Sequence, residues 1–318
     1  MMEDRVDILL ATYEGGPYLT EQLESIMRQS YPHFHLYIRD DGSTDQTLST
    51  IDSFLQNYPD RISVISSNQR LGVKGNFSEL MNHAHANYIM FCDQDDIWLP
   101  HKIESSLRKI KDLENQHGTQ SPLLIHTDLT VVDGNLEILS HSFWEYSQLK
   151  PHRANSLNRL LAHNIITGCT ILINKPLLQL AAPIPEEAVM HDWWLGLVAS
   201  TFGRIDFLEE STILYRQHSK NDIGAKNWRA FSTYLAYAKK AFQLFGREEL
   251  RFRLLKTIYQ ASHFFTRYES YLEHQEKRLL QNYVALGTTN ALQKRYLFLK
   301  HRYFKNTLPK NIGMFLFL

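Results

Sequence analysis

The sequence predicts an α/β fold built on a doubly wound, mostly parallel β-sheet with flanking helices. Apolar runs that suit buried strands alternate with segments of helical spacing through the first hundred residues. Three of these runs end directly in polar or acidic residues. Ligands bind at the carboxyl ends of the strands in such sheets, so we expect these polar residues to meet in one crevice.

Four strands and three helices account for this alternation. The expected strands are residues 6–11, 35–39, 62–65 and 88–92. The expected helices, in which apolar residues recur every three or four positions, are residues 18–29, 46–57 and 76–85. Ser43 or Thr44 is expected to cap the second helix. The residues that follow the first, second and fourth strands are therefore expected at one edge of the sheet.

The rest of the chain is less regular. Residues 123–126, 129–132 and 170–173 are expected to be strands, with a hairpin turn at 133–135. From Trp228 onward, long helical patterns rich in Tyr, Phe, Lys and Arg predict a helical C-terminal extension. We therefore expect a sheet domain over residues 1–224 and a basic, aromatic-rich helical extension over residues 225–318.

The composition is ordinary for a globular protein that can bury a sizeable core. The 318 residues are 43% hydrophobic and 21% charged. Cys92 and Cys169 both lie in apolar runs, so we expect buried thiols and a reducing, cytoplasmic compartment. The first residues lead straight into a strand-like run, and no eighteen consecutive residues are apolar. Neither a signal peptide nor a membrane-spanning helix is therefore expected.

The net charge of zero hides a strong asymmetry along the chain. Residues 1–224 contain 17 Lys and Arg against 29 Asp and Glu, whereas residues 225–318 contain 17 against 5. This division favours an acidic catalytic body with a basic appendage that faces an anionic surface. The alternative is a basic face that docks on the acidic body.

Three carboxylates follow the fourth expected strand, in the segment Asp93-Gln94-Asp95-Asp96. Carboxylates this close repel one another, and burying them unpaired would cost several kcal/mol. A hard divalent cation can hold them together, and Mg²⁺ sites commonly combine one or two carboxylates with substrate phosphates. A solvated acidic turn is the alternative interpretation of this motif.

Taken together, these motifs resemble those of the family-2 glycosyltransferases, which have the GT-A fold, over about residues 5–222. The matching motifs, in family order, are Ala11-Thr12-Tyr13, Asp40 to Asp45, Asn68, Gly72 to Asn76, Asp93 to Asp96, Gly168-Cys169-Thr170, His191 to Trp194, and Tyr215 to His218. The form Cys-Asp-Gln-Asp-Asp-Ile-Trp over residues 92–98 is most similar to the rhamnosyltransferase-type branch that builds bacterial surface polysaccharides.

The resemblance implies a nucleotide-binding set. Thr12, Tyr13 and Glu14 are expected to line the nucleobase pocket, although the family pattern has Asn at the position of Glu14. Asp41 is expected to accept a hydrogen bond from the imide N–H of the base, and the alternative is a turn or capping aspartate. Asn76 is assigned to the same set.

The resemblance also implies a metal site. Asp93 is expected near the ribose, and Asp95 is expected to coordinate Mn²⁺ or Mg²⁺ that bridges the donor diphosphate. His218 is similar to a late-chain histidine that approaches the metal or the diphosphate, and the alternative is a surface histidine. Two roles stay open for Asp96: it assists at the site, or it caps the following helix.

The candidate general base is Asp192. An acceptor hydroxyl must lose its proton as it attacks the anomeric carbon, and a carboxylate within reach can take it. Family members carry Glu-Asp where this chain has His191-Asp192, so His191 is expected to orient or shape the site. Of Trp193 and Trp194, one is expected in the core and the other stacked on a sugar face.

The function that this resemblance implies is an inverting, metal-dependent sugar transfer. The preferred donor is dTDP-rhamnose, and the preferred acceptor is a hydroxyl of a growing surface polysaccharide or a lipid-linked glycan. A UDP-hexose donor is the alternative within the class. A non-catalytic nucleotide-binding module is the alternative outside it, which the joint presence of Asp95 and Asp192 disfavours. A basic arm that binds nucleic acid is disfavoured by the acidic body.

Residues 291–318 predict peripheral attachment to the inner face of a bacterial cell membrane. Here six cations alternate with apolar side chains and no acid interrupts them. The cations are Lys294, Arg295, Lys300, Arg302, Lys305 and Lys310, and the apolar set is Tyr296, Leu297, Phe298, Leu299, Tyr303 and Phe304. The alternative is that these aromatic rings pack on the catalytic body or on a second subunit.

Overall fold

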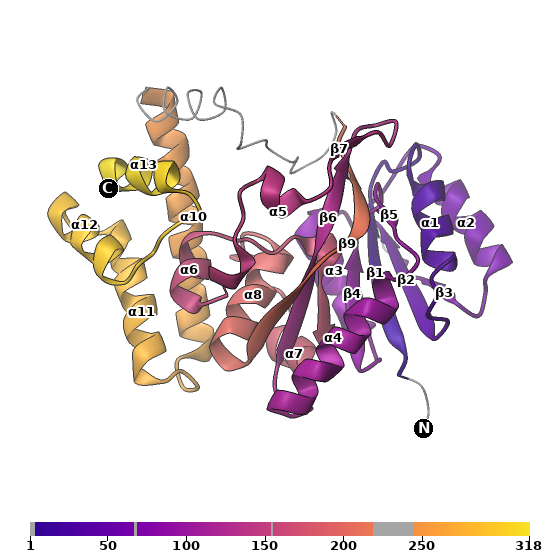
Figure 1. Cartoon of the computed structure of the whole chain (residues 1–318), viewed down its shortest axis with the longest axis horizontal. Helices are drawn as coiled ribbons and strands as arrows, with labels where there is room; N and C mark the ends of the chain where they lie inside the picture. The colour runs from indigo at the N-terminus through magenta and orange to yellow at the C-terminus, as the bar shows by residue number, and fades with distance from the viewer. Residues whose placement is uncertain (1–3, 67–68, 154, 219–243) are drawn as a thin grey trace. The chain divides into compact units, whose positions relative to one another are not determined.

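Two units make up the described chain. The structure is a computed structural model that describes residues 4–66, 69–153, 155–218 and 244–318 (Figure 1). The sheet unit contains residues 4–143, 166–186 and 190–218, and the helical unit contains residues 144–165, 187–189 and 244–318. The boundary expected between residues 224 and 225, the helical pattern expected over 228–243, and Asn68 lie outside the described residues.

One half of the sheet is parallel. Its strands are β1 (Val6–Thr12), β2 (Phe34–Asp40), β3 (Ile62–Val64) and β4 (Tyr88–Cys92), in the spatial order β3-β2-β1-β4. All five residues of β4 are buried, as the apolar run predicted. The expected strand–helix alternation and the mostly parallel sheet are therefore confirmed.

The other half of the sheet is mixed. β8 (Leu172–Asn174) lies between β4 and β6 (Leu123–Val132) and is antiparallel to both. β9 (Arg204–Arg216) runs parallel to β6, whereas β5 (Ile97–Trp98) and β7 (Ile138–Ser140) are antiparallel edge pieces on β9 and β6. This half brings the end of β9 back to the acidic residues that follow β4.

Two expectations for this half were wrong. The strands expected at 123–126 and 129–132 are one continuous strand, β6. The polar residues between them do not interrupt it, because the Thr127 hydroxyl hydrogen-bonds the Thr212 hydroxyl at 2.7 Å and Asp128 accepts the Leu129 N–H at 2.8 Å. Thr170, expected at the start of a strand, lies instead in the 3-10 turn η2 (Gly168–Thr170).

Helices cover both faces of the sheet. They are α1 (Leu19–Met27), α2 (Thr47–Asn57), α3 (Gly72–Asn82), α4 (Lys102–His117), α7 (Lys175–Ala181) and α8 (His191–Phe202). A short α5 (Phe143–Tyr146) spans the boundary between the two units in the sequence. Tyr88 and Phe91 point to opposite faces of β4, since they are three residues apart. The Tyr88 hydroxyl donates to Glu114 of α4, whereas the Phe91 ring meets rings from α3 and α8.

The expected cap of the second helix was also wrong. Gln46 is the N-cap of α2, and its side chain makes no capping hydrogen bond. Asp45 serves instead, because its Oδ1 accepts the Thr47 N–H at 2.9 Å. Its Oδ2 accepts the Gly16 N–H at 2.9 Å, so Asp45 ties the turn after β1 to the start of α2.

The helical unit has its own core. Its helices are α6 (Leu157–Ala162), α10 (Leu244–Tyr268), α11 (His274–Val284), α12 (Ala291–Lys300) and α13 (Leu308–Phe317), with 3-10 turns η1 (Pro151–Arg153) and η3 (Ala285–Gly287). Phe264, Leu280 and Tyr283 are buried in it. Within the described ranges, none of the helices has the length and apolarity that a membrane crossing requires.

Candidate active site

The acidic segment Asp93–Asp96 forms the turn between β4 and β5. Asp93 and Asp95 are half-buried and Asp96 is fully buried. The turn lies at the carboxyl end of β4, beside the ends of β1 and β2 in the same parallel register. The structure thus brings the residues that follow these three strands to one edge of the sheet, as the sequence predicted.

Asp95 and His218, the two expected metal ligands, face each other. The Oδ2 atom of Asp95 lies 2.9 Å from Nε2 of His218. Their side chains are 15% and 11% exposed. The His218 ring stacks on Tyr18 of the turn before α1, with 4.5 Å between ring centroids. A carboxylate oxygen is a ligand that Mn²⁺ and Mg²⁺ prefer, whereas an imidazole nitrogen is more usual on transition metals than on Mg²⁺.

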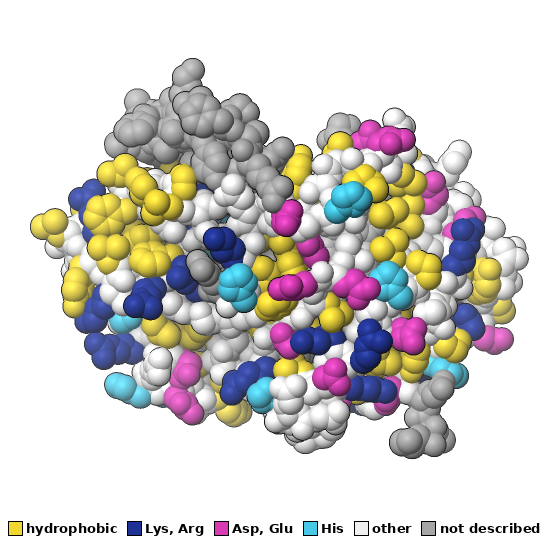
Figure 2. Space-filling view, in the orientation of Figure 1, with side chains coloured by type: hydrophobic (Ala, Val, Ile, Leu, Met, Phe, Trp, Pro, Cys, Tyr) yellow, Lys and Arg dark blue, Asp and Glu magenta, His cyan; other side chains and the backbone are white. Residues whose placement is uncertain are grey.

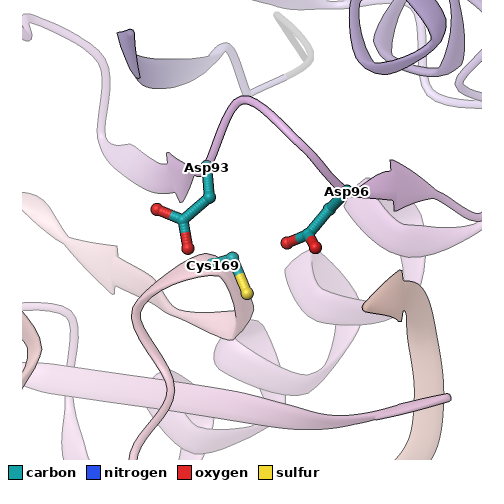
Figure 3. Close-up of side chains that lie close together, drawn as sticks. All are labelled: Asp93, Asp96 and Cys169. Atoms are coloured by element: carbon teal, nitrogen blue, oxygen red, sulfur yellow. The ribbon is translucent and has the colours of Figure 1, made fainter. Parts of the chain in front are cut away.

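Asp96 points inward, to a cluster with Asp93 and Cys169 of η2 (Figure 3). Ligand atoms of the three residues lie within 4.8 Å of one another. Burial raises the pKa of Asp96 well above its usual range, and the charges of Asp95 and Asp93 raise it further. Burial likewise raises the pKa of the Cys169 thiol. The Cys169 side chain is hydrogen-bonded to the Asp96 carboxyl.

Of the two roles left open for Asp96, capping the following helix was wrong, and assisting at the site stays a prediction. Its Oδ1 atom accepts the backbone N–H of Arg216 at 3.3 Å, so Asp96 joins the acidic turn to the end of β9. The N-cap of α4 is His101, and Asp96 does not cap that helix. Lys102 is fully buried nearby, its ammonium 4.6 Å from the Trp98 ring centroid, and burial lowers its pKa to about 8.

Arg216 was missed as a functional residue, although it lies within the motif that contains His218. Its guanidinium donates to the carbonyls of Asp95 and Gly134, each at 3.2 Å, and to the carboxylate of Glu21 in α1. It also lies over the Tyr18 ring at 4.9 Å. The side chain is only 4% exposed. Arg216 therefore fixes the backbone of Asp95 relative to the end of β9, two residues before His218.

The turn after β1 carries the expected nucleobase residues. Thr12 is buried, and its hydroxyl donates to Asp40 at 2.9 Å. Glu14 has a positive φ of 51°, a conformation that costs energy outside glycine. Its carboxylate accepts both the N–H and the hydroxyl of Thr44, at 2.8 and 3.0 Å. Glu14 thus joins the turns after β1 and β2.

Tyr13 is the exposed member of this turn, at 39%. The Arg70 guanidinium lies 4.0 Å from its ring centroid. The Gln94 side chain accepts the Tyr13 N–H and donates to the Tyr13 carbonyl, each at 2.8 Å. Gln94, the middle residue of the Asp-Gln-Asp motif, therefore couples the turn after β1 to the acidic turn. Sequence reasoning gave it no role, because its partner is 81 residues away.

Asp41 lies in a buried network with Arg39 and Asn76. Its Oδ1 accepts from the Arg39 guanidinium at 3.0 Å and from the Leu71 N–H at 2.7 Å. Its Oδ2 accepts the Gly72 N–H at 2.8 Å, which leaves capacity for a further donor such as a base N–H. The Asn76 amide oxygen accepts from Arg39 at 2.9 Å, and its amide nitrogen donates to the Arg39 carbonyl at 3.1 Å. Asn76 thus contacts the Arg39 side chain and backbone.

The start of α8 places Asp192 at the first turn of a helix, where the helix dipole favours negative charge. Asp192 is 9% exposed, and its Oδ1 accepts the Trp193 N–H at 2.6 Å. Trp194 is fully buried and donates from Nε1 to the Ala181 carbonyl, whereas Trp193 is half-buried. Trp194 is therefore the core residue of the pair.

His191 packs in the core beside this helix start. Its ring centroid lies 4.1 Å from that of Phe77 and 5.5 Å from that of Phe91. Burial lowers the pKa of His191 to about 3, so the ring is neutral. A Cβ atom on Gly168 would come within 2.6 Å of its Nε2, so glycine is needed there. This contact sets the start of α8 against η2, whose Cys169 belongs to the acidic cluster.

Residues 7–179 match the family model described as "Glycosyl transferase family 2". The dTDP-rhamnosyl transferase RfbG of Shigella flexneri is 28% identical over 228 residues, which cover 68% of this chain and 74% of RfbG. The uncharacterized glycosyltransferase alr2836 of Nostoc sp. is 23% identical over 227 residues, covering 69% and 66% of the two chains.

Solved structures support the fold. TarS 1-349 of S. aureus, in complex with UDP-GlcNAc, aligns with a TM-score of 0.51 and 16% identity, covering 98% of this chain and 90% of that one. The mannosyltransferase PcManGT of Pyrobaculum calidifontis, in complex with GDP-Man and Mn²⁺, aligns with a TM-score of 0.53 and 15% identity, covering 98% and 78%. The family model spans more than half of the chain. With its GT-A type sheet, the chain therefore belongs to glycosyl transferase family 2.

Proposed function

We propose that this glycosyltransferase moves L-rhamnose from dTDP-rhamnose, with inversion, onto a hydroxyl of a growing surface polysaccharide or a lipid-linked glycan. The observation that carries the proposal of a metal-dependent transfer is the contact between Asp95 and His218 at the edge of the sheet. The choice of rhamnose rests on the similarity to RfbG. A UDP-hexose is the competing donor, and the experiment below separates the two.

Asp95 and His218 would hold the divalent cation. When bound, such an ion supplies positive charge where the nucleoside diphosphate leaves and orients its phosphates. Arg216 keeps the Asp95 backbone in place through its 3.2 Å hydrogen bond. The exposed Tyr13 ring offers an apolar face to the base, and Asp41 keeps acceptor capacity for the base N–H.

Asp192 acts as the general base in this proposal. It takes the proton of the acceptor hydroxyl as that oxygen attacks the anomeric carbon, and the sugar–phosphate bond breaks on the opposite side. Direct displacement on a β-linked L-rhamnosyl donor gives an α-linkage. The half-buried Trp193 next to Asp192 is suited to stack on a sugar face, and buried His191 shapes the helix start from behind.

The proposed place of the reaction is the inner face of a bacterial cell membrane, where a lipid-linked acceptor would be found. The proposal is supported by the basic, aromatic-rich composition of the C-terminal region. An association with anionic lipid would raise the local concentration of enzyme near such an acceptor.

A donor screen tests the proposal. Release of nucleoside diphosphate is followed with dTDP-rhamnose, UDP-glucose and UDP-galactose, each with and without Mn²⁺ and with a rhamnan-type or lipid-linked acceptor. We expect release from dTDP-rhamnose in the presence of Mn²⁺. Asp192→Asn should lower turnover at least about 10²-fold with donor binding retained. Asp52→Asn, an exposed aspartate on α2, is the control.

Three outcomes would contradict parts of this proposal. Release from a UDP-hexose alone would replace the donor. If turnover after chelation is the same with and without added Mn²⁺, the reaction does not depend on the metal. Near-normal turnover of Asp192→Asn would remove this residue as base, and binding of nucleotide without any release would favour a non-catalytic module.

A further inference from the structure

Two helices of the helical unit carry apolar stripes that are exposed. On α12, Leu292, Tyr296 and Leu299 recur at spacings of four and three residues, and on α13, Leu308, Ile312 and Leu316 recur every four. Such spacing places each set on one helical face. All six side chains are at least half exposed, and Leu292 reaches 79%. We call these six residues the two-helix surface.

The two helices are nevertheless well packed. Their other sides bury Leu297, Phe298 and Met314. The Arg295 side chain joins them, donating to the Phe315 carbonyl at 3.1 Å with its guanidinium 5.5 Å from the Phe315 ring centroid. Each helix therefore has one apolar side in the core and a second one exposed. Figure 2 shows hydrophobic side chains gathered over α12 and α13, with Lys and Arg side chains around them.

The charged residues of α12, α13 and the segment between them are all positive. No Asp or Glu follows Glu276, whereas Lys or Arg occurs eight times. These cations are Lys277, Arg278, Lys294, Arg295, Lys300, Arg302, Lys305 and Lys310. Lys300 and Arg302 are exposed, and the Lys300 ammonium lies 4.9 Å from the ring centroid of exposed Tyr296. Cations thus border the apolar side chains directly.

The structure corrects the sequence-based view of this segment. Two of its six cations face the protein: Lys310 is 8% exposed, and burial lowers the pKa of Lys305 to about 8. Leu297, Phe298 and Tyr303 are buried as well. The Tyr303 hydroxyl donates to the Leu279 carbonyl at 2.6 Å. Deleting residues 291–318 would therefore open the core of the helical unit, so surface substitutions are the proper test.

We infer that the two-helix surface docks on an anionic lipid bilayer, with its apolar side chains among the head groups and Lys300 and Arg302 on their phosphates. Apolar stripes bordered by cations match that interface. A second copy of this surface fits poorly, because the charged residues of α12, α13 and the segment between them are all positive and would repel their copies. The inference concerns binding alone, so it holds or fails independently of the donor sugar.

Co-sedimentation with vesicles tests it, using the full chain without donor or metal. Vesicles of phosphatidylglycerol and phosphatidylcholine are compared with vesicles of phosphatidylcholine alone. We expect the wild type to sediment with the anionic vesicles at low salt. The triple variant Leu292→Gln/Leu299→Gln/Leu316→Gln should bind at least about tenfold more weakly. Lys300→Gln/Arg302→Gln should lose about 25-fold, at about fivefold per cation, and this loss should shrink at high salt.

The matched control is Leu48→Gln/Arg28→Gln, which removes one exposed leucine and one exposed arginine from the sheet unit. It should bind like the wild type. All substituted side chains are exposed, and thermal unfolding checks that each variant folds. A wild type that ignores anionic vesicles at low salt, or surface variants that bind as well as the control, would overturn the inference. So would a wild-type dimer that the triple variant converts to monomer, because a second copy would then cover the surface.

Discussion

The two acidic turns at the edge of the sheet differ in what compensates their charge. After β2, Asp40 accepts the N–H groups of Gly42 and Ser43, and Asp41 accepts from Arg39 and two backbone N–H groups. After β4, Asp93 and Asp96 form a cluster with Cys169, and Asp95 faces the imidazole of His218. The charge of the first turn is compensated by hydrogen bonds from the Arg39 side chain and from backbone N–H groups. In the second turn, burial and the neighbouring carboxylates raise the pKa of Asp96, and this turn is where we propose that the cation binds.

The largest effect is expected from removing the carboxylate that faces His218. Asp95→Ala should lower Mn²⁺-dependent turnover by about 10² to 10³-fold, because a metal ion supplies several kcal/mol of charge stabilisation. The measurement is turnover against Mn²⁺ concentration. Asp112→Ala removes an exposed aspartate from α4 and serves as the charge-matched control. Unchanged metal dependence in Asp95→Ala would contradict the proposal that the turn after β4 binds the cation.

A substitution in the first turn, after β2, should change the free energy of unfolding. Asp41→Asn breaks a pair in which both partners are buried, and leaves the Arg39 charge without its carboxylate. We expect the free energy of unfolding to fall by about 2 to 3 kcal/mol, measured by urea denaturation. Asp52→Asn on the exposed face of α2 should stay within about 0.5 kcal/mol. A stable Asp41→Asn would show that this turn does not depend on its internal pair.

Arg216 should link the second turn to β9. Arg216→Lys keeps the charge but loses the planar fork that contacts Asp95, Gly134 and Glu21. We expect the Mn²⁺ concentration for half-maximal binding of dTDP to rise about tenfold, with a smaller rise for Glu21→Gln, whose side chain is half exposed. A loss of thermal stability without any shift in metal dependence would make Arg216 a structural residue only.

The smallest expected effect is on stability at low pH and comes from His191, which packs against η2 next to the acidic cluster. Its pKa of about 3 is below the unfolded value, so the folded state cannot take up a proton that the unfolded chain binds. The contribution of neutral His191 to folding stability is fully present above about pH 6.5 and is lost as the pH falls toward 3. Relative to His191→Leu, the wild type should lose about 1 kcal/mol of stability between pH 7 and pH 5.5. Parallel pH curves for the two proteins would contradict a buried neutral histidine.

Local signals made much of the fold predictable. The apolar run Tyr88–Cys92 identified a buried strand, and the acids after it had to lie at the carboxyl edge. The same reasoning failed at β6, because the hydroxyl of Thr127 is paired by Thr212, a residue 85 positions away. The parallel pairing of β9 with β6 has the same long-range character.

The candidate site shows the same difference between features that local sequence predicts and features that depend on long-range contacts. Motif matches named Asp95 and His218, and the structure brings them within hydrogen-bonding distance. The partners of Gln94, Arg39 and Arg216 are long-range contacts that no local pattern reveals. Exposure in the C-terminal region was equally unpredictable, since the buried Lys310 and exposed Lys300 lie in similar sequence.

Calorimetric titration of dTDP, with and without Mn²⁺, tests the division between the two turns most directly. We expect Mn²⁺ to strengthen binding to the wild type. Asp95→Ala should bind equally with and without Mn²⁺, whereas Asp41→Ala should bind more weakly in both conditions and keep the strengthening by Mn²⁺. Loss of the same Mn²⁺-dependent part in both variants, or a wild type that does not respond to Mn²⁺, would contradict the account.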